Sequence, residues 1–137
     1  MIKRLFTVGL IAMMTLFVVQ ACAQSEKEKS SAEDTRITAS EFQDQIDKQP
    51  GVVIDVRTQD EYDQGHVASV DYHLDLLNGD FESSLDSLDK DKTYYLYCRT
   101  GNRSGQAADL MRQKGFENIY NIGGFQDLVD AGVESKQ

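Results

Sequence analysis

Cys98 lies in a sequence context that favours a reactive thiolate. It follows the strand-like run Thr93–Tyr97 and is followed directly by the segment Arg99-Thr100-Gly101-Asn102-Arg103-Ser104. Gly101 and Asn102 tolerate positive φ, so this segment can curl with its backbone N–H groups pointing inward. Those groups, the N-terminus of a following helix and the two arginines would lower the thiol pKa and bind an anionic substrate. We therefore expect Cys98 to be a catalytic nucleophile; the alternative is a buried structural cysteine beside a chance turn.

The segments around this loop alternate between strand and helix patterns. Short apolar, β-branched or aromatic runs predict strands, and apolar residues at helical spacing between start and stop signals predict helices. The predicted strands are Val52–Val56, Val70–Leu74, Thr93–Tyr97 and Asn118–Ile122. The predicted helices run from a capping box at Thr38 to just before Pro50, and over Phe81–Leu88, Arg103–Lys114 and Gly124–Ala131. This alternation predicts an α/β fold with a small, largely parallel sheet flanked by helices on both faces. Sites in such sheets lie beyond the carboxyl ends of the strands, where Cys98 is placed.

The N-terminal residues do not belong to this predicted domain. Lys3 and Arg4 precede the apolar run Leu5–Val19 and the small residue Ala21, which is the layout of a secretory signal peptide over residues 1–21. A retained anchor helix is the alternative, and the shortness of the apolar run disfavours it. Residues 22–35 are small, charged and polar, and we expect them to form a flexible tether. Residues 36–137 then form one domain, because the chain is long enough for one compact core.

The residues before the predicted cleavage point also suggest an anchor. Val19-Gln20-Ala21-Cys22 resembles the lipobox of bacterial lipoproteins, in which the cysteine is lipidated and becomes the first residue of the mature protein. Gln20 departs from the usual small or branched residue, and a simple secretory signal cleaved near Ala23 is the alternative. The resemblance implies an exported domain, anchored to a bacterial membrane by lipid on Cys22 and facing the periplasm or the cell exterior. Cys98 would then be a lone thiol in an oxidising compartment.

The chain is acidic. It has 14 Lys and Arg against 23 Asp and Glu, a net charge of −9; without residues 1–21 the balance is 12 against 23, or −11. Such a surface disfavours nucleic acid and anionic membranes as partners, so a lipid anchor would be the only membrane contact. We expect a monomer. With two histidines far apart in the sequence and one free cysteine, we predict no metal site and no cofactor.

An ordered set of short motifs resembles a rhodanese-like domain over about residues 36–131. The motifs are Asp55-Val56-Arg57, Glu61-Tyr62, Gly65-His66-Val67, the run from Tyr97 to Ser104, Gly115-Phe116 and Gly123-Gly124-Phe125. The resemblance implies a small parallel sheet flanked by helices. It also implies sulfur transfer, in which the loop cysteine takes sulfur from a sulfane donor, holds it as a persulfide and passes it to a nucleophile. Two departures concern packing rather than chemistry: Val67-Ala68-Ser69-Val70-Asp71 lacks the usual Gly-Ala pair, and Phe125 stands near a position where Trp is common.

On this hypothesis Cys98 is catalytic and the loop after it binds substrate. The substrate-binding residues are expected to be Arg99, Thr100, Gly101, Asn102, Arg103 and Ser104. Arg103 is expected to hold the shape of the loop, and Arg99 to face the substrate. The donor would be a small sulfur-containing anion, and thiosulfate fits the arginine-bearing loop better than mercaptopyruvate. The acceptor stays open between a thiol, cyanide, sulfite and a partner protein.

Two other classes of function are alternatives to enzymatic sulfur transfer: a phosphatase, and a persulfide carrier or binding module. Cysteine-based phosphatases of similar fold use a Cys-x5-Arg loop that wraps a tetrahedral phosphate, whereas Cys98 and Arg103 form a Cys-x4-Arg loop, one residue shorter. The phosphatase alternative is therefore disfavoured. A persulfide carrier without turnover, or a binding or regulatory module, remains the main alternative.

The other polar candidates are expected to support the structure. Asp55 and Arg57 follow a buried strand, and we expect them to fix neighbouring loops through an ion pair rather than to act in catalysis. His66 lies in a Gly-His turn and is expected to be structural rather than a proton donor. Packing roles are expected for His73, on the exposed side of a strand, and for Tyr94, Tyr95 and Tyr97.

Overall fold

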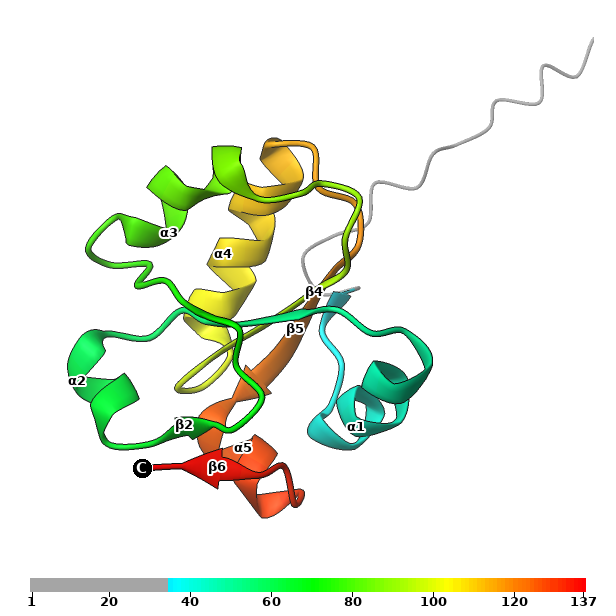
Figure 1. The fold of residues 1–137 in the computed structure, drawn as a ribbon, viewed down its shortest axis with the longest axis vertical. Coiled ribbons are helices and arrows are strands. Elements are labelled where there is room, and N and C mark those ends of the chain that lie inside the picture. Colours follow the sequence, from blue (N-terminus) through cyan, green and yellow to red (C-terminus); the bar gives the residue numbers. More distant parts are fainter. Residues whose placement is uncertain (1–34) are drawn as a thin grey trace, which may run out of the picture.

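The computed structural model describes residues 35–137, whose fold is shown in Figure 1. The predicted signal peptide, Cys22 and the tether up to residue 34 lie outside the described residues. Within residues 35–137 no helix is both long and apolar enough to cross a bilayer.

Four parallel strands form the central sheet in the order β3-β1-β4-β5. Their bounds are Val52–Asp55 for β1, Tyr72–His73 for β3, Tyr94–Cys98 for β4 and Ile119–Gly124 for β5. The two central strands, β1 and β4, pair in register from Val52 opposite Tyr94 to Asp55 opposite Tyr97. All five residues of β4 are buried, as expected for a strand that is covered on both faces. Its last residue, Cys98, pairs with Gly124 of β5 after a shift in register.

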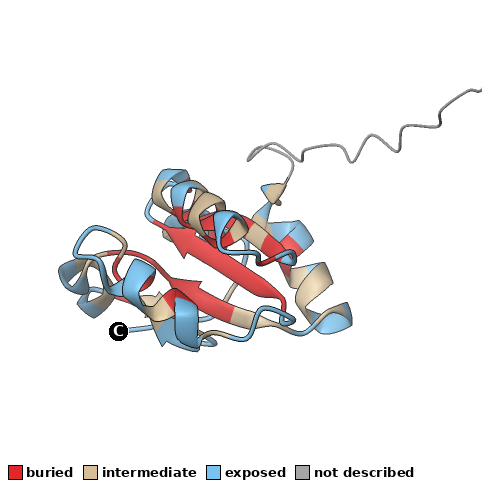
Figure 2. Ribbon diagram, turned by 90° about the horizontal axis from the view of Figure 1, so that it is seen from above, coloured by how far each residue is buried: buried red, intermediate tan, exposed pale blue. Residues whose placement is uncertain are grey.

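Helices cover both faces of this sheet, which confirms the predicted fold class (Figures 1 and 2). On one face lie α4 (Asn102–Gln113), α3 (Asp80–Ser84) and the 3₁₀ turn Leu85–Ser87; on the other lie α1 (Ala39–Lys48) and α5 (Phe125–Asp130). Successive side chains of a strand point to opposite faces, so Leu96 and Cys98 join the core beneath α4. Tyr95 and Tyr97 join the separate core beneath α1 and α5. Cys98 therefore has its side chain on the α4 face of the sheet.

Two short sequence signals begin helices in the same way. The predicted capping box at Thr38 is confirmed: its hydroxyl accepts a hydrogen bond from the Glu41 N–H at 3.2 Å, and the Glu41 carboxylate accepts one from the Thr38 N–H at 2.7 Å. A second box, Thr58 with Glu61, begins the short helix α2 (Gln59–Asp63). The sequence pattern did not predict this helix, because five residues are too few for a helical period to be recognised.

Other elements also differ from expectation. β3 has only two residues, not the five predicted from Val70 to Leu74, and the helix predicted over Phe81–Leu88 divides into α3 and the 3₁₀ turn. β5 extends to Gly124, so α5 begins one residue later than predicted. A second sheet was not predicted at all: β2 (His66–Val67) pairs antiparallel with β6 (Ser135–Lys136). Two-residue strands are too short to show an alternating pattern, and their pairing depends on residues far apart in the chain.

Candidate active site

The Cys98 side chain lies at the carboxyl end of β4, inside the curl of the loop that leads into α4. Gly101 has φ +95° and allows the loop to turn, so that its backbone N–H donates to Cys98 Sγ at 3.0 Å. The Ser104 hydroxyl donates to the same sulfur at 3.5 Å. Asn102 is already the first residue of α4, so the turn depends on Gly101 rather than on both residues. The cysteine itself is fully buried.

The environment of Cys98 favours the thiolate in spite of its burial. Burial raises the pKa of the Cys98 thiol, but the Ser104 hydroxyl and the N–H groups of Ser104, Thr100 and Gly101 together bring that pKa below its ordinary value. Arg103 contributes a smaller electrostatic attraction between its charge and the sulfur. The sequence predicted that the N–H groups of the loop, the helix N-terminus and the two arginines would lower this pKa. The hydrogen bonds of the loop are the main causes in the structure, which confirms that part of the prediction.

Asn121 positions this loop from the neighbouring strand, and sequence reasoning missed it. Its Oδ1 accepts a hydrogen bond from the Gly123 N–H at 3.0 Å, and its Nδ2 donates to the Gly101 carbonyl at 2.9 Å. The same Oδ1 lies 2.7 Å from the Ser104 hydroxyl, which shares its one proton between this oxygen and Cys98 Sγ. Asn121 is itself buried in β5. A polar side chain in the middle of the buried run Ile119–Gly124 was the signal that could have identified it, because buried polar groups are kept only with partners.

Arg103 is held by α2 rather than by the loop. Its Nη1 and Nη2 each lie 2.7 Å from one carboxylate oxygen of Glu61, which also accepts hydrogen bonds from the Thr58 N–H and hydroxyl. The Arg103 guanidinium, with help from Thr58, lowers the pKa of Glu61 to about 2. This two-pronged ion pair ties the first turn of α4 to α2.

Glycine is required where the loop meets its neighbours. A Cβ on Gly101 would lie 2.8 Å from Nη2 of Arg36, whose guanidinium donates to the Thr100 carbonyl at 3.3 Å. A Cβ on Gly124 would lie 2.5 Å from the Arg99 carbonyl oxygen. The contact at Gly124 is with backbone, so a side chain there would force the loop and β5 apart. At Gly101 the Arg36 side chain could move aside, and it is the φ of +95° that favours glycine.

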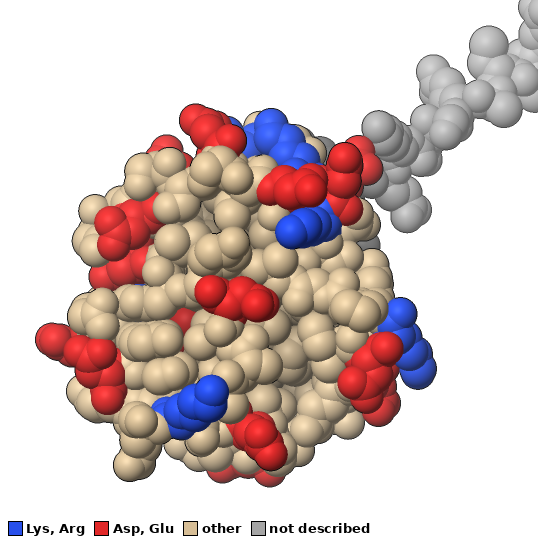
Figure 3. Space-filling view, in the orientation of Figure 1, with Lys and Arg blue, Asp and Glu red and all other residues tan. Residues whose placement is uncertain are grey.

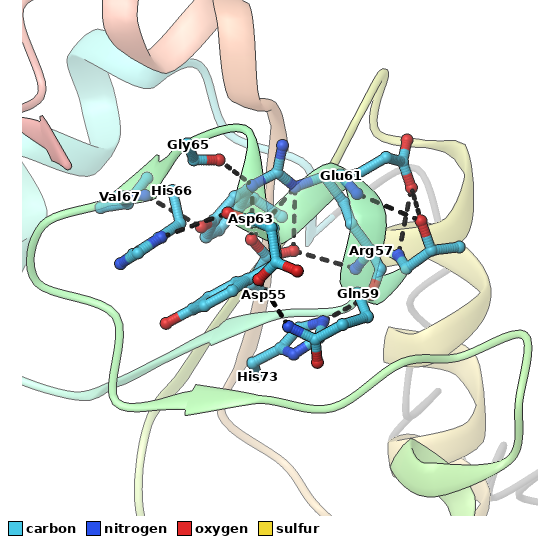
Figure 4. A network of polar contacts seen from close by, with 12 residues as sticks. Asp55, Arg57, Gln59, Glu61, Asp63, Gly65, His66, Val67 and His73 are labelled. Atoms are coloured by element: carbon cyan, nitrogen blue, oxygen red, sulfur yellow. Dashed lines mark hydrogen bonds and ion pairs between the residues drawn. The ribbon is translucent and has the colours of Figure 1, made fainter. Parts of the chain in front are cut away.

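Asp55 and Arg57 form a buried ion pair beside the Cys98 loop (Figure 4). Arg57 Nε lies 3.0 Å from both Asp55 oxygens, and Nη2 lies 2.7 Å from Oδ2 and 2.7 Å from the Gly65 carbonyl. Burial alone would lower the pKa of Arg57, but the bonds and charge of Asp55 raise it. The guanidinium carbon also lies 4.4 Å from the centre of the Phe125 ring. These contacts hold the guanidinium in one orientation.

Tyr97 and His73 have polar contacts beyond the packing roles predicted for them. The Tyr97 hydroxyl accepts a hydrogen bond from the Val67 N–H at 3.1 Å, and burial together with Asp55 raises the pKa of Tyr97. His73 is half-buried, and its Nε2 donates to the Arg57 carbonyl at 2.8 Å. The expectation that His73 lies on an exposed strand face was therefore wrong, because the Tyr62 ring of α2 covers it, with ring centres 4.3 Å apart.

His66 packs on the same ring. Its imidazole is stacked on Tyr62 with ring centres 4.0 Å apart, and its Nδ1 lies 3.3 Å from the Tyr62 carbonyl (Figure 4). Neither histidine forms a hydrogen bond to the Cys98 loop within residues 35–137. In the same part of the chain, no three His, Cys, Asp or Glu side chains converge as metal ligands would.

A hollow of about 580 Å³ opens in front of the loop. Its lining residues are Arg57, Glu61, Gln64, Gly65, Arg99, Thr100, Phe125 and Gln126. Arg99 and Thr100 are exposed at this wall, whereas Ser104 and Gly101 are buried behind them. The six predicted substrate-binding residues therefore have different places in the structure. Arg99 and Thr100 line the hollow, and Gly101 and Ser104 contact the sulfur. Arg103 braces the loop and Asn102 begins α4.

Taken together, these features define an α/β protein in which a loop at the end of a central strand surrounds a buried cysteine and lowers its pKa. The chain belongs to the rhodanese-like domain family, whose pattern it matches over residues 38–131. The structure of protein hp1203 from Helicobacter pylori is similar to this chain, with a TM-score of 0.62 and 31% identity, covering 77% of this chain and 92% of hp1203.

Several curated proteins are similar to this chain at about the same sequence identity as hp1203. A tRNA uridine(34) hydroxylase of Erwinia tasmaniensis is 33% identical over 91 residues, 64% of this chain and 26% of the relative. The putative sulfur carrier protein YrkF of Bacillus subtilis is 30% identical over 87 residues, 63% of this chain and 45% of the relative. The thiosulfate sulfurtransferase PspE of Escherichia coli is 32% identical over 77 residues, 56% of this chain and 72% of the relative. The chain thus spans less than half the length of the first two.

The hydrogen bonds to Cys98 predict a measurable shift in its reactivity. The rate of alkylation by iodoacetamide, measured against pH, should have its midpoint below that of an unperturbed cysteine, about 8.5. Ser104→Ala should move the midpoint upward, because the variant loses the hydroxyl donor to Sγ. Ser87→Ala, at a residue outside the site, is the control. An unshifted midpoint in the native chain would mean that the loop amides do not stabilise the thiolate.

The Glu61–Arg103 ion pair predicts a pH-dependent contribution to stability. Because the folded-state pKa of Glu61 is lowered from 4.5 to about 2, the contribution is fully present above pH 4.5 and is lost as the pH falls toward 2. Urea unfolding should show Glu61→Gln less stable than the native chain at neutral pH by on the order of 1 kcal/mol, since the pair is partly solvent-screened.

In the same urea experiment, the difference in free energy of unfolding between Glu61→Gln and the native chain should become smaller as the pH falls from 4.5 to 2. Glu82→Gln, at an exposed residue of α3, is the matched control and should change stability little. A difference that stays constant down to pH 2 would contradict the ion pair as the cause.

Proposed function

We propose that this chain is a sulfurtransferase that carries sulfane sulfur as a persulfide on Cys98. The observation that carries the proposal is a fully buried cysteine whose sulfur accepts hydrogen bonds from the Gly101 N–H and the Ser104 hydroxyl. A thiolate stabilised in this way is a nucleophile at neutral pH. The same donors suit a persulfide, which also carries a negative charge on sulfur.

The first half-reaction uses a small anionic donor, and we propose thiosulfate. The Cys98 thiolate attacks the outer sulfur of thiosulfate, a new S–S bond forms, and the old S–S bond breaks with its electron pair leaving on sulfite. The persulfide anion and the sulfite dianion carry the same total charge as the thiolate and thiosulfate. The exposed Arg99 at the hollow, and the similarity to a protein named thiosulfate sulfurtransferase, support an anionic donor.

The second half-reaction passes the outer sulfur to an acceptor. A thiolate or cyanide attacks that sulfur, takes it as a persulfide or thiocyanate, and leaves Cys98 as the thiolate again. A hollow of about 580 Å³ is far larger than cyanide needs and is in the range of pockets that bind organic ligands. This volume favours a thiol, free or on a partner protein, as the acceptor.

The contacts of Arg103 argue against phosphatase chemistry. A phosphatase loop needs its arginine on the bound phosphate, whereas both terminal nitrogens of Arg103 are bonded to Glu61. The second candidate is a carrier that forms the persulfide without turnover, and the similarity to a putative sulfur carrier protein favours it.

Loss of the thiol should abolish sulfur loading. Cys98→Ser is nearly isosteric and should fold normally, but a hydroxyl is far less acidic and cannot hold a persulfide. After incubation with thiosulfate, intact mass should show one added sulfur atom on the native chain and none on the variant. Turnover to thiocyanate with cyanide separates an enzyme from a carrier. Equal sulfur loading of the variant would disprove Cys98 as the site.

We further propose that the domain is exported and anchored by lipid on Cys22, on the strength of the lipobox resemblance. A tether of about a dozen residues reaches roughly 20 Å, so the domain would work close to the membrane face. In detergent phase separation the native chain should enter the detergent phase, and Cys22→Ser should appear as soluble protein or unprocessed precursor. Equal partitioning of the two would contradict the anchor and leave an ordinary secreted domain.

A further inference from the structure

Arg57 has one terminal nitrogen that its ion pair does not use. Nε and Nη2 are bonded to Asp55 and the Gly65 carbonyl, but Nη1 forms no hydrogen bond with any residue that the structure describes. Arg57 is only 4% exposed. No fully buried polar side-chain atom among the described residues lacks a partner, and Arg57 lines the hollow in front of the Cys98 loop. The unpaired Nη1 is therefore the part of Arg57 that reaches the hollow.

The orientation of this nitrogen is set before any ligand binds. Asp55 is bonded to one edge of the guanidinium, and the Gly65 carbonyl accepts from Nη2 (Figure 4). The Phe125 ring packs against the guanidinium, with its centre 4.4 Å from the guanidinium carbon. Gly65 has φ +141°, in the region that favours glycine, so its carbonyl position depends on a backbone conformation other residues rarely adopt. A guanidinium held by these three residues loses little entropy when its remaining nitrogen binds an anion.

The charges around the hollow favour an anion although the chain as a whole is acidic. Figure 3 shows acidic side chains outnumbering basic ones on one face of the domain. Around the hollow, however, the carboxylate of Glu61 is bonded to Arg103, and the carboxylate of Asp55, buried behind Arg57, is bonded to Arg57. Arg99 has no ion-pair partner among residues 35–137. The lining of the hollow thus includes one uncompensated positive charge, Arg99, and one N–H donor of fixed orientation, from Arg57.

We propose that Arg57 binds the oxyanion end of the sulfur donor through Nη1, with Arg99 as the second cation. This inference rests on the proposed function and assigns a residue to substrate recognition in it. The ligand chemistry is a sulfonate-like group, whose oxygens keep the negative charge when the S–S bond breaks and sulfite leaves. Because Asp55 occupies the other edge of the guanidinium, Arg57 offers this group one nitrogen rather than a two-pronged fork.

Direct binding tests this assignment without sulfur transfer. In the full chain carrying Cys98→Ser, which cannot react, thiosulfate binding is measured by calorimetry with and without Arg57→Lys. Lysine keeps a positive charge opposite Asp55 but has no second nitrogen to reach the hollow. The dissociation constant should rise on the order of tenfold or more, the effect of losing one charged hydrogen bond. Arg112→Lys, on the outer face of α4, is the matched control and should change nothing.

A pair of alkylating reagents separates anion recognition from a merely structural role. Iodoacetate and iodoacetamide react with the same Cys98 sulfur, but only iodoacetate carries an oxyanion. Arg57→Lys and Arg99→Gln should each slow iodoacetate on the order of tenfold and leave the iodoacetamide rate nearly unchanged. Equal slowing of both reagents by Arg57→Lys would show that Arg57 only holds the structure, and would overturn the assignment.

A measurement on the native chain keeps the proposal testable if Arg57→Lys does not fold. Sulfate, an unreactive oxyanion, should protect Cys98 from iodoacetate and should shift the Arg57 guanidinium resonances in the NMR spectrum. Protection without any shift at Arg57 would overturn the proposal. Failure of Cys98 to form a persulfide with any donor would instead contradict the proposed function, while the binding and alkylation results would still decide the role of Arg57.

Discussion

A sulfur atom removed from water can carry negative charge only if hydrogen-bond donors replace the lost water, and the end of β4 is built around that requirement. The Cys98 sulfur is fully buried, and the Gly101 N–H and the Ser104 hydroxyl point at it. These donors are useful only while the loop keeps its curl. Polar contacts from three neighbouring elements hold that curl in place.

Three elements brace the loop from different sides. β5 does so through Asn121, which binds the Ser104 hydroxyl and the Gly101 carbonyl. α2 does so through the Glu61–Arg103 ion pair, and Arg36 does so from the segment before α1. Each brace is a hydrogen bond or ion pair between segments far apart in the chain. The loop geometry is therefore a property of the assembled sheet and not of the Cys-x4-Arg segment alone.

The acidic composition of the chain is compatible with the anionic donor that we propose, because the acids near the hollow are paired. Asp55 and Glu61 each face an arginine, so neither opposes an incoming anion with an uncompensated charge. Pairing also orders the arginines: Arg103 becomes a brace, while Arg57 has one nitrogen left for the hollow. The three arginines thus differ in their carboxylate partners: Asp55 pairs with Nε and Nη2 of Arg57, Glu61 pairs with both terminal nitrogens of Arg103, and no carboxylate among residues 35–137 pairs with Arg99.

The amino-acid sequence alone determined the alternation of strands and helices, the Thr38 cap and the position of Cys98 at the carboxyl end of a buried strand, because these depend on local periodicity and backbone preference. It placed Cys98 just after that strand, whereas the structure has it as the last residue of β4. It also indicated the ion pair of Asp55 with Arg57, which lie two residues apart. Only the tertiary structure decided the partners of Arg103, the role of Asn121, the β2–β6 pair and the contact of His73 with Tyr62. Those interactions join residues distant in sequence, and no local pattern records which buried polar group will find which partner once the sheet has assembled.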